Sequence, residues 1–232
     1  MNTTVVATKD VAGFKTARRV NLAFTASLEK RALVWMAERA PAWVSSDGLT
    51  LLGLGAQIGA GVCYAFARYE PRALLLVVGC IVLNWLGDSL DGTLARVRLQ
   101  QRSRYGFYVD HMVDLFGSIA LMCGLGWSGL LHWPVAIAML VAFLLLSSES
   151  YLATYTLGCF ELSQGFFGPT EIRILLIAGT LAALRNPHAT VFGHRMLLFD
   201  VGGVIGAAAM FAMAMAVTVR HTAGLYRQEP LP

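Results

Sequence analysis

The sequence is poor in charged residues and has no obvious disulfide or zinc framework. Of its 232 residues only 14% are charged, whereas 56% are hydrophobic, and the mean hydropathy is +0.61. This composition excludes an ordinary soluble domain and predicts an integral membrane protein. The four cysteines are scattered through apolar stretches without metal-ligand spacing, so we expect neither a disulfide framework nor a zinc site.

Several other signals are missing from the sequence. The first twenty residues lack a continuous apolar core flanked by a cleavage site, so no secretory signal peptide is evident. No internal repeat stands out. The net charge of +4 is better explained by membrane topology and anionic lipid than by nucleic acid. We therefore expect membrane lipids, and no nucleic acid, among the partners.

Long apolar segments are what the sequence has instead. We predict an all-α integral membrane protein with six transmembrane helices, preceded by an amphipathic helix at the cytoplasmic interface. The six predicted spans are residues 49–67, 73–95, 107–127, 134–157, 171–185 and 197–219. The fifth segment is short for a membrane span.

The predicted organisation has four parts: a poorly ordered segment 1–26, an amphipathic juxtamembrane helix 27–44, a six-helix domain 45–220 and a cytoplasmic tail 221–232. In the juxtamembrane helix, apolar residues such as Leu33 alternate with charged ones, and tryptophans suit the membrane boundary. A solvated soluble helix is the alternative interpretation. Ser45 to Gly48 supply capping residues for the first span.

Four aspartates interrupt the apolar pattern where the second span ends and the third begins. They are Asp88, Asp91, Asp110 and Asp114. An aspartate at the centre of a membrane costs roughly 2.5–3.5 kcal/mol on insertion scales. A cluster of four therefore implies an offsetting cation or a polar cavity, and it is an active-site signature rather than the solvated end of a helix.

The spacing of these aspartates predicts two facing helical surfaces. One surface carries Asp88, Asp91, Gly92, Ala95 and Arg96, and the other carries Gly106, Asp110 and Asp114. The small residues leave room for a ligand to approach the backbone. Clusters of carboxylates alone suit hard cations such as Mg²⁺, Mn²⁺ or Ca²⁺.

The distribution of lysine and arginine predicts the orientation. With the N-terminus inside, fourteen of the 18 lysines and arginines fall on the cytoplasmic side. The other side keeps Arg68, Arg72, Arg185 and Arg195. We therefore expect both termini and the aspartate cluster on the cytoplasmic side, which is that of the inner membrane if the cell is bacterial.

Weaker candidates for an acceptor site lie outside this cluster. They are Arg102, Arg104, Glu149, Glu171 and Arg173. Glu171 and Arg173 either contact an acceptor or anchor a helix N-terminus. Glu149 is either a buried structural hydrogen-bond partner or part of the cavity. Arg102 and Arg104 are either interfacial or bind a phosphate on the acceptor.

The strings Asp88-Ser-Leu-Asp91-Gly92-Thr-Leu-Ala95-Arg96 and Gly106-Phe-Tyr-Val-Asp110-His-Met-Val-Asp114 resemble a family signature. It is that of the CDP-alcohol phosphatidyltransferase family, the class I CDP-alcohol phosphotransferases, written D-x2-D-G-x2-A-R and then G-x3-D-x3-D. All eight fixed residues are present, within 27 residues of the chain.

The resemblance implies residue roles at these positions. Asp88, Asp91, Asp110 and Asp114 would bind divalent metal, with Asp114 the favoured general base. Asp88, Gly92, Ala95, Arg96 and Gly106 would form the nucleotide site. We expect Mg²⁺ or Mn²⁺, two ions per site, and the resemblance also suggests a homodimer. His111 follows Asp110 as in the choline- and ethanolaminephosphotransferase branch, where this histidine is implicated in proton transfer; a supporting or interface role is the alternative.

The resemblance implies a membrane transferase of phospholipid synthesis. The leading hypothesis is that it moves a phosphatidyl group from CDP-diacylglycerol to the hydroxyl of a polar alcohol and releases CMP. The nearest rival transfers a polar phospho-head group from another CDP-alcohol, such as CDP-choline or CDP-ethanolamine, to a lipid hydroxyl. A rival of another class is a divalent-cation transporter that uses the same carboxylates.

Overall fold

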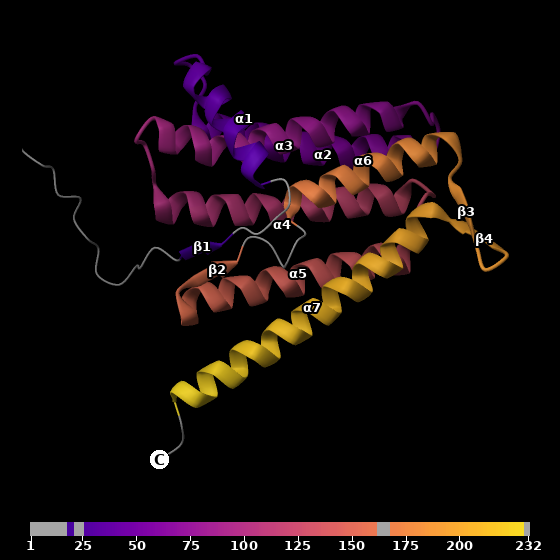
Figure 1. Cartoon of the computed structure of the whole chain (residues 1–232). Coiled ribbons are helices and arrows are strands. Elements are labelled where there is room, and N and C mark those ends of the chain that lie inside the picture. The colour runs from indigo at the N-terminus through magenta and orange to yellow at the C-terminus, as the bar shows by residue number, and fades with distance from the viewer. Residues whose placement is uncertain (1–17, 21–25, 162–167, 230–232) are drawn as a thin grey trace, which may run out of the picture.

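The computed structural model describes residues 18–20, 26–161 and 168–229, and these residues form seven helices and four short strands (Figure 1). The helices are α1 Ala26–Arg39, α2 Ser46–Phe66, α3 Ala73–Val97, α4 Ser103–Trp127, α5 Trp133–Leu157, α6 Pro169–Arg185 and α7 Leu198–Gln228. The strands are β1 Arg18–Val20 and β2 Cys159–Glu161, which pair in parallel, and β3 His188–Val191 and β4 His194–Leu197, an antiparallel hairpin. Most of the segment 1–26, predicted to be poorly ordered, lies outside the described residues.

Five of the described helices are long and apolar enough to span a membrane. These are α2, α3, α4, α5 and α7. They make the chain a multi-pass membrane protein with a helical fold. The fifth predicted span is present as α6, but its 17 residues make it shorter than the other five. The count of six spans therefore stays a prediction.

Two helices are longer in the structure than the sequence predicted. α4 begins at Ser103 rather than at residue 107, and α7 continues to Gln228 rather than ending at residue 219. Residues 221–228, which we assigned to the tail, are therefore helical. The side chain of His221 explains part of this extension, because its Nδ1 lies 2.6 Å from Glu149 Oε1 and ties α7 to α5.

Close contacts between small residues hold α2 against α3 and α4. A Cβ atom added to Gly87 of α3 would lie 2.6 Å from the carbonyl oxygen of Leu49 and 2.7 Å from the backbone nitrogen of Gly53, both on α2. Gly61 of α2 and Gly124 of α4 approach each other in the same way. Such close backbone approach is typical of helices that pack inside a membrane, and it brings the polar faces of the three helices together.

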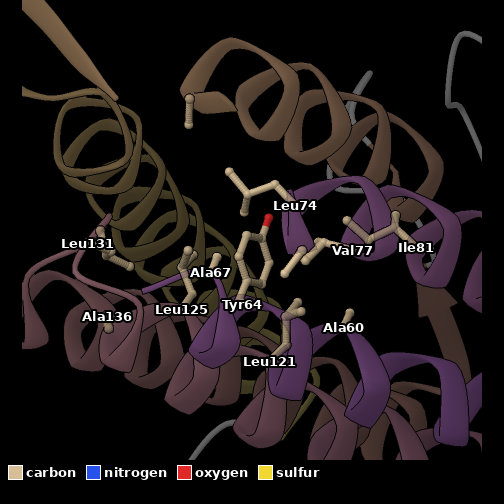
Figure 2. Packing of buried hydrophobic residues seen from close by; sticks show 12 residues of the cluster. Ala60, Tyr64, Ala67, Leu74, Val77, Ile81, Leu121, Leu125, Leu131 and Ala136 are labelled. Carbon is tan, nitrogen blue, oxygen red and sulfur yellow. The ribbon is translucent and has the colours of Figure 1, made fainter. Parts of the chain in front are cut away.

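The buried side chain of Tyr64 joins α6 to this three-helix unit. Its ring is fully buried among Leu74, Val77, Leu121 and Leu125 (Figure 2). Its hydroxyl lies 2.6 Å from Thr180 Oγ1 on α6, so the polar end of the tyrosine is hydrogen-bonded inside the core. This contact fixes the middle of α6 beside α2.

α1 packs on α3 through its apolar face. Leu33 and Ala37 are buried in a cluster with Leu90 and Leu94, whereas Glu38 on the opposite face is exposed. Arg98 at the end of α3 donates hydrogen bonds to the carbonyl oxygens of residues 40 and 41, at 3.0 and 2.8 Å. The prediction of an amphipathic helix here agrees with this burial pattern, while its position on a membrane surface stays a prediction.

The cysteines of the described core are free thiols, as expected from their scattered positions. Cys63 and Cys80 pack against the core cluster around Tyr64, and Cys123 is exposed. The side chain of Cys159 lies outside the described part of the structure.

Candidate active site

All four predicted aspartates line one cavity between α2, α3 and α4. The residues that line it are Thr50, Gly53, Leu54, Gln57, Asn84, Asp88, Asp91, Asp110, Val113 and Asp114. α3 supplies the first two aspartates and α4 the other two, so the two predicted helical faces do meet. α2 completes the wall with polar side chains that the sequence did not single out.

Asp91 is the most deeply buried of the four carboxylates, with 4% of its surface exposed. Thr50 on α2 donates a 2.6 Å hydrogen bond to Asp91 Oδ2, and the backbone N–H of Gly92 donates to Oδ1. Ser46 Oγ also donates to the Asp91 carbonyl oxygen at 2.9 Å. Since a buried carboxylate needs donors or a cation, α2 sets the orientation of this side chain.

Asp88 forms an ion pair with Arg173 of α6. The distance from Arg173 Nη2 to Asp88 Oδ2 is 2.6 Å, and Arg173 Nε donates to Asn84 Oδ1 at 2.9 Å. Asn84 Nδ2 in turn donates to the carbonyl oxygen of Gly53 at 3.0 Å. A chain of hydrogen bonds thus runs from α6 through α3 to α2 along the cavity wall.

Asp110 and Asp114 are half-buried on α4, with Val113 beside them in the cavity wall. Their spacing of four residues places both carboxylates on one helical face. Gln57 of α2, which also lines the cavity, is tied to α4 through a 3.4 Å hydrogen bond from its Nε2 to Ser118 Oγ. The α4 carboxylates therefore face the same polar wall as those of α3.

The ring of His111 packs between helices rather than among the cavity-lining residues. Its Nδ1 lies 2.6 Å from the carbonyl oxygen of Phe107, which makes Nδ1 the protonated donor because a carbonyl only accepts. The ring also lies 4.2 Å from that of Phe107 and 4.9 Å from that of Tyr151 on α5. His111 is thus directed toward α5.

Apart from Asp88, which lines the cavity, the residues that the family signature assigns to the nucleotide lie beyond the cavity, toward the C-terminal end of α3 and the N-terminal end of α4. Arg96 is exposed, and its Nη2 donates to Thr93 Oγ1 at 2.9 Å. A Cβ atom added to Gly92 would have Arg96 Nη1 as its nearest neighbour, at 3.5 Å, and one added to Gly106 would meet no described atom within 4 Å. An added Cβ would therefore be in ordinary contact with Arg96 at Gly92, and it would meet open space at Gly106.

The five acceptor candidates are not brought together. Arg102 pairs with Asp47, Glu149 pairs with His221, and Arg104 is exposed. Glu171 accepts a 2.9 Å hydrogen bond from the backbone nitrogen of Gly168 and so caps α6. Arg173 is the candidate that the structure places against a cavity carboxylate.

The donor set of the cavity suits a hard divalent cation in chemical type. Carboxylates, a threonine hydroxyl and amide oxygens are the ligands that Mg²⁺ and Mn²⁺ prefer. Within the described ranges, however, no three His, Cys, Asp or Glu side chains are gathered closely enough to hold one ion. The carboxylates of Asp88 and Asp91 point instead to Arg173 and Thr50.

Sequence reasoning missed three polar residues of the cavity wall, which are Thr50, Gln57 and Asn84. Asn84 carried a usable signal, because it interrupts an apolar run and stands four residues before Asp88, on the same helical face. Thr50 carried none, because a threonine is common in apolar helices and its contact with Asp91 depends on how α2 packs.

Comparison with known proteins assigns the chain to a family. Residues 43–220, which include the whole cavity, match the CDP-alcohol phosphatidyltransferase family. The chain is 27% identical to cholinephosphotransferase 1 of Danio rerio over 192 residues, which are 74% of this chain and 48% of that protein. It is 33% identical to an uncharacterized protein of Aquifex aeolicus (strain VF5) over 150 residues, 61% of this chain and 70% of that one. The match thus spans about half the length of the cholinephosphotransferase. The chain belongs to the CDP-alcohol phosphatidyltransferase family, as its aspartate signature predicted.

Proposed function

We propose that this protein is a CDP-alcohol phosphotransferase that moves the phosphatidyl group of CDP-diacylglycerol to the hydroxyl of a polar alcohol. The observation that carries the proposal is the single cavity lined by Asp88, Asp91, Asp110 and Asp114. Family membership supports the same chemistry. It also argues against the cation-transporter hypothesis, since the carboxylates come with the complete transferase signature.

The reaction replaces the phosphoanhydride bond of the donor by a phosphoester bond to the acceptor. The acceptor oxygen attacks the phosphorus that bears the diacylglycerol, the bond from that phosphorus to the oxygen of CMP breaks, and CMP leaves. The hydroxyl proton passes to Asp114, whose carboxylate lies in the cavity wall. His111 is the weaker candidate for the base, because its ring packs against Tyr151 of α5 and is not among the residues that line the cavity.

The four aspartates would hold Mg²⁺ or Mn²⁺, which we expect as two ions per site. When bound, these ions neutralise the pyrophosphate of the donor and stabilise the departing CMP. The protein keeps Asp91 oriented through Thr50 and the N–H of Gly92. Arg173 places a positive charge beside Asp88, where it can orient a phosphate or a polar acceptor.

The cytidine nucleotide would lie along the small residues at the ends of α3 and α4. The open space beside Gly106 and the position of Arg96 next to Gly92 support this assignment. Ala95 lies on the same face of α3 as Gly92. The exposed guanidinium of Arg96 would hold the nucleotide or its phosphates.

A second candidate function is the transfer of a phospho-head group from a CDP-alcohol to a lipid hydroxyl. The similarity to a protein named cholinephosphotransferase 1 favours it. The position of His111 favours the first candidate, because this histidine packs on α5 instead of lining the cavity. The two candidates share the cytidine donor chemistry and differ in which substrate carries the lipid.

The proposal includes a membrane arrangement. α6 would be the sixth span, and α1 would lie on the cytoplasmic surface, with Trp35 and the following Trp43 exposed to the interface. The termini and the cavity would be cytoplasmic, in accord with the lysine and arginine distribution. We also propose a homodimer with one site per protomer; a detergent-corrected mass of a monomer alone, in both mild detergent and nanodiscs, would contradict it.

An assay of two donor classes tests the proposal. Purified protein with Mg²⁺ or Mn²⁺ receives labelled CDP-diacylglycerol with glycerol phosphate, inositol, inositol phosphate or serine, or else labelled CDP-choline or CDP-ethanolamine with diacylglycerol. CMP release and lipid product are both measured. Product from the first set alone supports phosphatidyl transfer, product from the second alone supports the rival, and a folded protein that releases no CMP with either overturns both.

A further inference from the structure

Glu29 is a carboxylate of α1 that joins two other helices. Its Oε1 accepts a 2.9 Å hydrogen bond from Trp85 Nε1 and a 3.1 Å bond from Ser89 Oγ, both on α3. Thr170 Oγ1 on α6 lies 3.0 Å from Oε1 and 3.1 Å from Oε2 of the same carboxylate. Three donors from two helices thus converge on one half-buried side chain.

The donors to Glu29 stand next to residues of the cavity wall. Trp85 follows Asn84, Ser89 follows Asp88, and Thr170 lies one helical turn before Arg173. Arg173 itself contacts both Asn84 and Asp88. The beginning of α6 is therefore tied to α3 twice, once through Glu29 and once through Arg173.

We infer that Glu29 is a positioning residue: it holds the first turn of α6 against α3, so that Arg173 meets Asn84 and Asp88. The effect of Glu29 on turnover rests on the proposed transferase function, whereas the contact that it makes between α3 and α6 does not. Glu29 precedes the family-matched residues, so α1 contributes to the site from outside the shared domain.

The negative charge of the Glu29 carboxylate strengthens the hydrogen bonds that it accepts from α3 and α6. A carboxylate only accepts hydrogen bonds, and bonds to an ionised acceptor are about twice as strong as neutral ones. The rest of α1 is held separately, by the burial of Leu33 and Ala37 and by the bonds of Arg98 to the chain after the helix. Removing the Glu29 carboxylate should therefore loosen α6 without releasing α1.

The experiment compares Glu29→Met and Glu29→Gln with Glu38→Met, the same substitution at an exposed glutamate of the same helix. We expect Glu29→Met to lower kcat about tenfold, as for a displaced catalytic group, with the KM for CDP-diacylglycerol within about threefold of the unmodified protein. Glu29→Gln keeps one acceptor oxygen and should recover about half of the lost activity or more. Glu38→Met should behave as the unmodified protein.

A fluorescence measurement tests the contact of α6 with α3 through Glu29 and does not depend on enzyme activity. The emission of Trp85 is isolated by subtracting the spectrum of the matching Trp85→Phe variant. We expect Thr170→Val, which removes only a hydroxyl from α6, to shift this emission when Glu29 is present and to leave it unchanged in Glu29→Met. Such a result shows that α6 acts on α3 through the carboxylate, even if the protein transfers nothing.

Several outcomes would overturn the inference. They are an unchanged kcat in Glu29→Met, a loss of activity that follows the melting temperature and is not recovered in Glu29→Gln, and a Trp85 emission insensitive to Thr170→Val. If Glu29→Met does not fold, the Thr170→Val variant alone tests the inference: a shift of the Trp85 emission supports it, and an unchanged emission overturns it. If the unmodified protein releases no CMP, the proposed function fails, and the emission measurement still decides whether Glu29 ties the helices.

Discussion

Arg173 on α6 pairs with Asp88 on α3, with 2.6 Å between Nη2 and Oδ2, and its Nε donates to Asn84 one turn earlier. Both side chains are largely covered, at 15% and 30% exposure. A guanidinium held by two fixed acceptors keeps its orientation, because its planar donors match both at once. This pair places the positive charge of α6 beside the carboxylates of the cavity.

Replacing Arg173 should therefore weaken transfer strongly. Arg173→Gln removes charge-assisted hydrogen bonds of about 1.5–3 kcal/mol, which correspond to a fall in kcat/KM of about 10- to 100-fold. Arg173→Lys should recover part of this, since an ammonium keeps the charge but not the planar fork. Arg185→Gln, at the exposed far end of α6, is the matched control. Equal kinetics for Arg173→Gln and Arg185→Gln would contradict the role.

Loss of any carboxylate of the proposed metal site should abolish transfer. Asp88→Asn, Asp91→Asn and Asp110→Asn each remove a ligand charge from the proposed site. CMP release is measured across a metal titration, with Asp47→Asn, outside the cavity, as the control. Chelation should also stop the unmodified enzyme, and Mg²⁺ or Mn²⁺ should restore it. Folded variants that keep most of their activity at every metal concentration would refute this assignment.

A larger side chain at Gly92 should exclude the nucleotide. Gly92→Leu should weaken CDP-alcohol binding more than it lowers thermal stability, because the one described atom near an added Cβ is Arg96 Nη1, at an ordinary contact distance of 3.5 Å. Gly79→Leu is the matched control, since it lies on α3 with no described atom within 4 Å of an added Cβ. Binding is followed by titration and stability by thermal unfolding. A parallel loss of both in Gly92→Leu would indicate helix packing instead.

The choice of base is tested by comparing Asp114 with His111. Asp114→Asn should lower turnover about 100-fold or more, within the range of general-base loss, and leave donor affinity within a few-fold. His111→Ala should cost much less, because His111 packs on Phe107 and Tyr151. Single-turnover rates and donor affinity are measured for each variant. The reverse ranking would make His111 the base and favour transfer to a lipid hydroxyl.

The amino-acid pattern alone predicted that two helices carry the aspartates of the candidate site. The spacing of Asp88 and Asp91, and of Asp110 and Asp114, determines that each pair shares a face, because that depends only on the period of an α-helix. Hydropathy likewise determined the apolar helices, since a membrane span needs a continuous run of apolar residues. Helix ends were less accurate where contacts extend them, as His221 does for α7.

Only the tertiary structure decided which partners these carboxylates have. Thr50, Arg173 and Glu29 are 41 or more residues distant in the chain from the groups they bind. No local periodicity specifies such pairs, because they depend on how α1, α2 and α6 pack against α3. That packing is set by close backbone contacts such as Gly87 with Gly53, and by the burial of Tyr64 against α6. The sequence alone thus determined which helical faces carry the aspartates, and the helix packing decided what surrounds them.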